Sequence, residues 1–144
     1  MRLSGYAYTM SNDNLDDDFI HLTNNAIQKN CPNYGAHEDG NQLSFPDLKK
    51  WLKSIGHKAS DFDNFILPKM KYQAAVSIYS ARKKFNTNKR KFCFELFGFD
   101  YILDSDLNVF LIECNTNPCI EESSKILKVL LPRMLDDMFK LTID

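Results

Sequence analysis

Cysteine pairing motifs are absent from this chain. Its four cysteines, Cys31, Cys93, Cys114 and Cys119, form no C-x-x-C pair and are not accompanied by closely spaced histidines. Zinc sites and disulfide frameworks depend on such spacings, so the sequence predicts neither of them. The thiols are expected to be reduced, as in a cytosolic protein.

Long apolar runs and a charge excess are missing as well. No stretch approaches the roughly 18 apolar residues of a membrane span, and the N-terminus lacks the apolar segment of a secretory signal. The formal net charge of -1 argues against a nucleic-acid binder, which usually carries a strong basic excess. A length of 144 residues with 44% hydrophobic and 26% charged residues fits one packed domain.

What is present is a mixture of helical and strand patterns, which predicts an α+β fold. The expected elements are a strand at 5–10, a helix capped within Thr23–Asn25 and ending near Lys29, a helix from Ser44 to Gly56, a helix from Pro68 to about 86, strands at 91–103 and 108–115, and a helix at 123–141 that Pro132 kinks or splits. The two later strands are expected to form one hairpin around the turn formers 104–106.

The hairpin predicts an unusual polar cluster. With a two-residue loop at 105–106, Gly98 would face Glu113 and Asp100 would face Leu111. Asp100 and Glu113 would then be diagonal neighbours, roughly 7 to 8 Å apart, with Asn115 on the same face. The opposite face, with Phe99, Tyr101, Phe110, Ile112 and Cys114, would be apolar and buried.

Two carboxylates and an amide oxygen on one sheet face suggest a site for a hard cation. Without a cation the carboxylates would repel each other, and oxygen ligands of this kind suit magnesium. Gly98, which has no side chain, would leave room for the ion and a phosphate. The alternative is that Asp100 and Glu113 are ordinary solvent-facing residues, which is the commoner outcome for an arbitrary hairpin.

Several segments resemble the tubulin-tyrosine ligase family. They are His21-Leu22-Thr23-Asn24, Gln28-Lys29, Asn33-Tyr34-Gly35, Glu38-Asp39-Gly40-Asn41, Phe94-Glu95-Leu96-Phe97-Gly98-Phe99-Asp100 and Leu111-Ile112-Glu113-Cys114-Asn115-Thr116-Asn117-Pro118. The likeness extends over nearly the whole chain. The run 27–41 resembles the tyrosine-adding members most, whereas the hairpin motif is shared with the glutamate- and glycine-adding members.

The resemblance implies an ATP-grasp fold, with residues 1–144 as an incomplete, C-terminal portion of the catalytic domain that lacks the phosphate-gripping lysines of the other lobe. ATP and Mg²⁺ would be the cofactors. The implied site residues are Asp100, Glu113 and Asn115 as metal ligands, Thr23, Asn24, Asp100 and Glu113 at the nucleotide, and Glu113 and Arg2 as catalytic residues, Arg2 gripping the substrate carboxylate.

The implied reaction joins an amino acid to a carboxylate of the acidic tubulin tail through an acyl-phosphate. Tyrosine is favoured as the free amino acid, with glutamate or glycine as alternatives, and the protein would be cytoplasmic, with the cytoskeleton or cilium as further locations. Two other readings stay open: a non-catalytic tubulin-binding remnant, and a purely structural α+β domain.

A basic segment suits an acidic partner. Between Lys69 and Lys91 the sequence has no acidic residue, and its basic residues are Lys69, Lys71, Arg82, Lys83, Lys84, Lys89, Arg90 and Lys91. Such a segment could steer the tubulin tail toward the site. A solvated helix face and loop explains it equally well.

Overall fold

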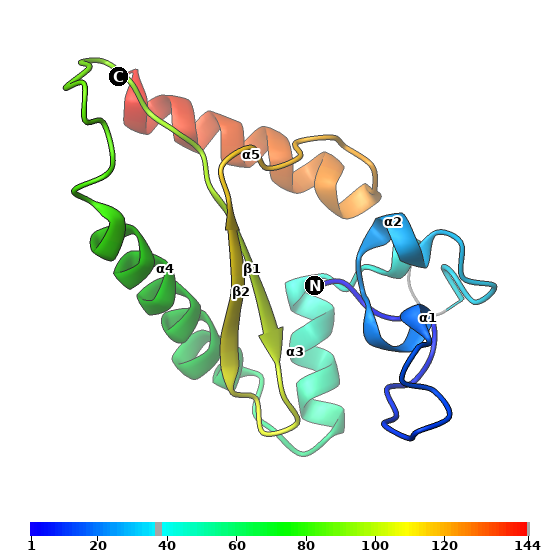
Figure 1. Cartoon of the computed structure of the whole chain (residues 1–144). Helices are drawn as coiled ribbons and strands as arrows, with labels where there is room; N and C mark the ends of the chain where they lie inside the picture. Colours follow the sequence, from blue (N-terminus) through cyan, green and yellow to red (C-terminus); the bar gives the residue numbers. More distant parts are fainter. Residues whose placement is uncertain (37–38, 144) are drawn as a thin grey trace. The chain divides into compact units, whose positions relative to one another are not determined.

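The computed structural model of the chain describes residues 1–36 and 39–143 and combines helices with one two-stranded antiparallel sheet (Figure 1). In chain order the elements are α1 (Asp18–His21), α2 (Asn25–Gln28), the 3₁₀ turn η1 (Asp39–Asn41), α3 (Phe45–Ser54), the π-helical turn η2 (Phe62–Ile66), α4 (Leu67–Ala81), β1 (Gly98–Leu103), β2 (Val109–Asn115) and α5 (Lys125–Thr142). This confirms the α+β class. Glu38, one position of the motif at 38–41, lies outside the described residues.

The chain divides into two compact units. The first comprises Met1–Trp51 and Glu121–Asp144, and the second comprises Leu52–Ile120. Helix α3 begins in the first unit and ends in the second.

The N-terminal segment of the first unit is not a strand, so the strand predicted at 5–10 is wrong. Among the described residues no strand pairs with it, and the Gly5 amide donates instead to the side-chain oxygen of buried Gln28, at 2.8 Å. A strand needs a neighbouring strand to satisfy its backbone hydrogen-bonding groups. The segment does form an isolated bridge, between Arg2 and Gln42.

Two helix starts follow the predicted capping chemistry. The Asn24 side chain accepts from the Ala26 amide at 2.9 Å and caps α2. Ser44 accepts from the Asp47 amide at 3.2 Å ahead of α3. Such caps satisfy amides that the first turn leaves without partners. Gly56, with φ of 92°, ends the α3 region in the left-handed conformation that glycine adopts readily.

One tryptophan and one proline stand out within the helices. Trp51 is 45% exposed, although tryptophan side chains are largely buried on average, whereas Leu48 and Leu52 of the same helix are buried. Helix α5 is one continuous helix that contains Pro132, so the proline does not split it. No helix among the described residues is long and apolar enough to cross a membrane.

In the second unit, α4 lies along the hairpin (Figure 1). The Tyr101 hydroxyl donates to the Met70 carbonyl at 2.7 Å, and the Gln73 amide donates to the Val109 carbonyl at 2.9 Å. Burial in this contact raises the pKa of the Tyr101 hydroxyl. The helix therefore covers the sheet face that carries Tyr101 and Val109.

The first strand of the hairpin is shorter than predicted. Pairing begins at Gly98, opposite Asn115, rather than near Lys91. Beyond Asn115 the chain soon reaches Pro118, which has no backbone N–H to donate to a ladder. Residues 91–97 therefore have no partner strand in β2.

Candidate metal site

The hairpin loop has three residues, not the two that were expected. Leu103 pairs with Val109, and the Asp104 amide donates to the Asn108 carbonyl at 3.2 Å. Leu107 occupies the left-handed region with φ of 62°. A turn followed by a left-handed residue is a common three-residue hairpin connection.

The Asp104 side chain fastens this loop. Its carboxylate accepts from the backbone amides of Asp106 and Asn108 at 3.0 and 2.7 Å, and from the Asn108 side chain at 2.9 Å. The hydrogen bond from the Asn108 side chain, supported by the two backbone amides, holds the pKa of Asp104 below its ordinary value. The turn chemistry thus sets the register near the loop.

That register alone would not form the polar cluster. Tyr101 pairs with Leu111, so an uninterrupted ladder would place Asp100 opposite Ile112 and Glu113 on the other face. Ile112 is instead left without a partner, as the extra residue of a β-bulge, and pairing resumes with Asp100 opposite Glu113. The bulge returns Glu113 to the face of Asp100.

The result is three polar groups at one place on the sheet. Asp100 faces Glu113 directly, and Gly98 faces Asn115 on the next position of the same face. The Asn115 amide donates to Asp100 Oδ2 at 3.3 Å and to Glu113 Oε1 at 3.2 Å. The predicted grouping of Asp100, Glu113 and Asn115 therefore holds, although the predicted diagonal relation of the two carboxylates is wrong.

The donor set fits a magnesium ion by its chemistry. Two carboxylates reach one amide, and rotating that amide about Cβ–Cγ exchanges its nitrogen for an oxygen. Mg²⁺ usually takes one or two protein carboxylates and keeps several waters, which suits the solvent-exposed carboxylates of Asp100 and Glu113. Within the described residues no three His, Cys, Asp or Glu side chains group as a metal site, so a site here would need the Asn115 amide as a third ligand.

Exposure of both carboxylates is also expected if Asp100 and Glu113 are ordinary surface residues. Ordinary surface residues would have no need to lie face to face, because like charges directly opposite each other destabilise a sheet. An amide shared by both acids, in contrast, brings a third ligand-type group to the same place.

The space beside Gly98 has a different use from the one expected. A Cβ built on Gly98 would lie 3.0 Å from Cβ of Pro118 and 3.7 Å from Cβ of Asn115. The missing side chain therefore lets the Pro118 turn pack against the hairpin, instead of leaving room for an ion opposite Glu113.

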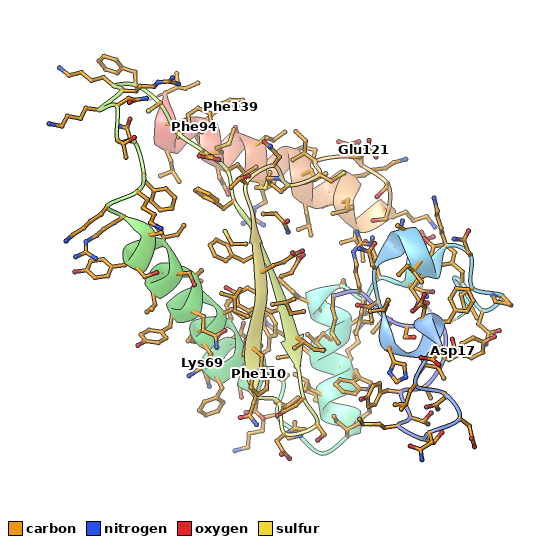
Figure 2. The ribbon with its side chains drawn as sticks, viewed as in Figure 1. Asp17, Lys69, Phe94, Phe110, Glu121 and Phe139 are labelled. Atoms are coloured by element: carbon orange, nitrogen blue, oxygen red, sulfur yellow. The ribbon has the colours of Figure 1, made fainter. Side chains whose placement is uncertain are left out.

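The bulge and loop also reassign the sheet faces. Val109 and Leu111 lie on the covered face with Tyr101, whereas Phe110 shares the face of Ile102 and Asp100. Phe110, labelled in Figure 2, is 51% exposed, and Cys114 is exposed as well. Ile112 is exposed too, so the expectation that Phe110, Ile112 and Cys114 would be buried is wrong.

The other candidate residues belong to the first unit. Thr23 and Asn24 are exposed immediately before α2, where the Asn24 side-chain oxygen caps the helix and, among the described residues, its amide nitrogen makes no hydrogen bond. Arg2 is exposed in the bridge to Gln42, which is held by the Leu3 amide donating to Asn41 and the Leu43 amide donating to Met1, at 2.8 and 2.9 Å.

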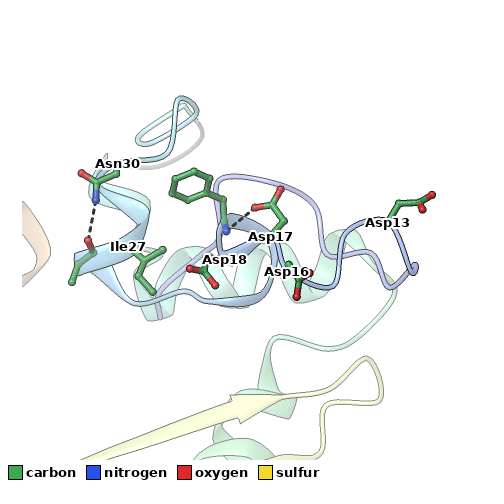
Figure 3. Close-up of a pocket in the computed structure, with 8 residues that line it drawn as sticks. Asp13, Asp16, Asp17, Asp18, Ile27 and Asn30 are labelled. Carbon is green, nitrogen blue, oxygen red and sulfur yellow. Dashed lines mark hydrogen bonds between the residues drawn. The ribbon is translucent and has the colours of Figure 1, made fainter.

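Acidic residues make up half of the lining of a cavity in the first unit (Figure 3). Its volume is about 720 Å³. Its lining residues are Asp13, Asp16, Asp17, Asp18, Phe19, Ala26, Ile27 and Asn30. Four carboxylates would repel a triphosphate, so this cavity does not suit the nucleotide.

Sequence reasoning missed two buried polar residues, Gln28 and Asn41. They are 1% and 6% exposed, respectively. Both occur inside the segments that carry the family resemblance, but no periodicity distinguishes a buried amide from a surface one. Their hydrogen bonds join residues that are distant in the sequence, so only the folded structure identifies them.

The fold and site define a mixed α+β chain with a carboxylate and amide site on a hairpin. The tubulin-tyrosine ligase family model matches residues 1–144, and the chain belongs to that family. It is 34% identical over 148 aligned positions to tubulin glycylase 3D of Tetrahymena thermophila, an alignment that covers 100% of this chain and 14% of that protein.

Two other relatives have similar identities. Tubulin glycylase 3B of Tetrahymena thermophila is 32% identical across 92% of this chain and 11% of its own length. Probable tubulin polyglutamylase TTLL9 of Rattus norvegicus is 33% identical across 86% of this chain and 25% of its own length. The chain thus spans a quarter or less of these three relatives.

Proposed function

We propose that residues 1–144 form the C-terminal, metal-binding part of an ATP-grasp catalytic domain in a ligase that adds amino acids to tubulin. The observation that carries the proposal is the pairing of Asp100 with Glu113 and their shared hydrogen bonds from Asn115. Membership of the tubulin-tyrosine ligase family supports the reaction class.

Each candidate residue has its own role in this reaction. Asp100, Glu113 and Asn115 hold Mg²⁺, which when bound offsets charge on the phosphate oxygens of ATP. The Thr23 hydroxyl and the Asn24 amide nitrogen bind the nucleotide from the start of α2. The Arg2 guanidinium, a planar fork of donors, grips a carboxylate of the substrate.

The reaction is a two-step acyl transfer. An acceptor carboxylate of tubulin attacks the γ-phosphorus of ATP, giving an acyl-phosphate and ADP. The amine of the incoming amino acid then attacks the acyl carbon, an amide bond forms, and inorganic phosphate leaves with the electron pair. No side chain of the protein acts as a nucleophile, so Glu113 contributes by holding the metal rather than by covalent chemistry.

Glycine or glutamate is the amino acid that we propose for addition. The three relatives are named as glycylases and a polyglutamylase, so they do not support the tyrosine preference inferred from the run 27–41. The names also support tubulin as the protein partner and a cytoplasmic or cytoskeletal place of action. All eight side chains of the basic segment are exposed, which suits an acidic tail.

A second candidate function is tubulin binding without catalysis. The exposed basic segment supports it, because eight cationic side chains without an acidic one suit an acidic tail whether or not the chain binds a metal. The two candidates differ in metal and nucleotide binding, which only the ligase requires.

Binding of Mn²⁺, a spectroscopic substitute for Mg²⁺, tests the proposal on the purified chain. Electron paramagnetic resonance measures free Mn²⁺, and we expect Glu113→Gln and Asp100→Asn each to weaken binding about tenfold or more, because a ligand charge is lost. Glu95→Gln is the matched control, an exposed acid outside the hairpin pairs. Equal Mn²⁺ binding by all four proteins would overturn the metal site.

Ligation itself is tested by transfer of radiolabelled glycine or glutamate to tubulin, in a protein that carries this chain together with the phosphate-gripping lobe. We expect Glu113→Gln to abolish transfer and Glu95→Gln to retain it. Transfer that persists in Glu113→Gln would refute the role of the hairpin. Transfer of tyrosine alone would refute the proposed amino acid while leaving the reaction class intact.

A further inference from the structure

Gln28 is a buried hydrogen-bonding centre in the first unit. Its side-chain nitrogen donates to the carbonyl of Phe19, within α1, at 3.1 Å and to the carbonyl of Leu22, the residue that ends α1, at 2.5 Å. Its side-chain oxygen accepts from the Gly5 amide at 2.8 Å. One carboxamide thus joins the residue immediately before Thr23 to the N-terminal segment that carries Arg2.

Asn41 extends this centre to a third segment. Its side-chain nitrogen donates to the Gln28 oxygen at 3.4 Å, and its side-chain oxygen accepts from the Gly35 amide at 2.7 Å. Its own carbonyl accepts from the Leu3 amide at 2.8 Å, one residue from Arg2. Asn41 has φ of 51°, a left-handed conformation that asparagine tolerates better than most residues.

The two amides share one task. The Gln28 side chain reaches the N-terminal segment at Gly5, and the Asn41 side chain supports it there by donating to the same Gln28 oxygen, whereas the bond from Leu3 is accepted by the backbone carbonyl of Asn41. The same Gln28 side chain restrains Leu22, the neighbour of Thr23. Buried hydrogen bonds of this kind are costly to leave unmade, so the segments cannot shift separately at low cost.

We propose that Gln28 and Asn41 are positioning residues, which hold the Thr23–Asn24 segment and the Arg2 segment in one fixed arrangement for nucleotide and substrate carboxylate. This inference rests on the proposed function, because it assigns a purpose to residues that the ligase would use. A carboxamide suits the task, since it donates at one end and accepts at the other. A methionine of similar length would fill the space and make none of these bonds.

Asn41→Gly and Gln28→Met test the inference in the purified chain. Asn41→Gly removes the side chain at a residue with positive φ, where glycine is accepted without backbone strain. Asn30→Gly is the matched control, since Asn30 is exposed and its side chain donates to the Ala26 carbonyl of its own turn, at 3.3 Å. The readouts are affinity for a fluorescent ATP analogue, Mn²⁺ affinity and amide hydrogen exchange, all well below the unfolding transition.

A positioning role predicts a selective effect. We expect Asn41→Gly and Gln28→Met to weaken nucleotide binding about tenfold and to speed amide exchange at residues 2–5 and 22–24. Mn²⁺ affinity, which depends on the hairpin, is expected to stay within about twofold of the unchanged chain, and Asn30→Gly to change neither affinity. A merely structural role would lower both affinities in proportion to the unfolded fraction.

The possible failures are distinguishable. Should the unchanged chain bind neither Mn²⁺ nor the nucleotide analogue, the proposed function is overturned and the positioning role falls with it. Should the unchanged chain bind both, and both variants bind the nucleotide as tightly, the positioning role alone is overturned. If Gln28→Met fails to fold, Asn41→Gly decides.

Discussion

Asp100 lies directly opposite Glu113 across the hairpin, although the loop register alone would place Ile112 there. The relation is therefore a product of one unpaired residue. It brings two acids to within hydrogen-bond distance of the same Asn115 amide. Since an uninterrupted ladder through Ile112 would turn Glu113 to the other face, the site depends on this bulge as much as on residue identity.

Deletion of Ile112 tests whether the bulge serves only to restore the facing pair. The deletion joins Leu111 directly to Glu113, so an uninterrupted ladder from the loop would still place Asp100 opposite Glu113, and we expect Mn²⁺ affinity to stay within about twofold of the unchanged chain. Ile112→Ala is the control, because it keeps the bulge and truncates a side chain that is already exposed. Electron paramagnetic resonance gives the affinity, and amide exchange reports whether β1 and β2 still pair. A roughly tenfold loss of Mn²⁺ affinity in the deleted chain, with the two strands still paired, would show that the bulge does more than set the register.

The Asp104 loop predicts a pH dependence. Because hydrogen bonds from Asn108 and Asp106 lower the pKa of Asp104 in the folded chain, ionised Asp104 contributes stability above its ordinary value of 3.8. That contribution is lost as the pH falls from this value through the lower folded pKa. We expect Asp104→Ala to lower the urea midpoint at about pH 7 and the difference from the unchanged chain to narrow at about pH 2.5.

Asp106→Ala is the control for that experiment, since it removes the same charge from the same loop. If the difference in urea midpoint between Asp104→Ala and the unchanged chain stays constant across the pH range, the ionised Asp104 carboxylate does not stabilise the loop as proposed. The midpoint is followed by circular dichroism.

Asn24 combines a structural and a binding role that substitution can separate. Asn24→Ala removes the cap of α2 and should cost about 1 kcal/mol of stability. Asn24→Asp keeps the capping oxygen, so stability should stay within about 0.5 kcal/mol. Asn24→Asp replaces the amide nitrogen by a negatively charged oxygen, and we expect it to weaken binding of the ATP analogue about tenfold. Nucleotide binding unchanged in Asn24→Asp would rule out the proposed contact.

Gly5 packs too closely against Cys31 to carry a side chain. A Cβ at position 5 would lie 2.6 Å from the buried Cys31 sulfur. Gly5→Ala should therefore cost about 1 to 3 kcal/mol through overpacking. In a Cys31→Ala background the same change should cost clearly less, because the obstructing sulfur is gone. Urea unfolding of the four proteins gives the coupling energy, and strictly additive costs would be the contrary result.

Local chemistry made much of this fold predictable. Asn24 and Ser44 have side chains that cap helices through near-neighbour bonds, so α2 and α3 were found at their starts. The hairpin was found because aromatic and branched residues flank turn formers. The family resemblance is confirmed by the comparison with known proteins.

What failed depended on contacts between distant residues. The strand predicted at 5–10 required knowing that Gln28, 23 positions later, would take the Gly5 amide. The diagonal placement of Asp100 and Glu113 failed because neither a left-handed Leu107 nor a bulged Ile112 has a clear signature in the sequence. The longer loop and the bulge each shift the pairing by one residue, and the two shifts together return Glu113 to the face of Asp100. The predicted residues therefore share one face, although their register differs from the predicted one.

Helix α4 has a consequence for the ion that the opposite sheet face would hold. A pair of strands is only marginally stable in water by itself, so the Tyr101 and Gln73 bonds to α4 help to keep β1 and β2 in shape. By mass action, a cation that binds only the formed hairpin also stabilises the packing of α4 against it. The temperature at which α4 unfolds should therefore rise with the concentration of free divalent ion, even though the ion does not contact that helix.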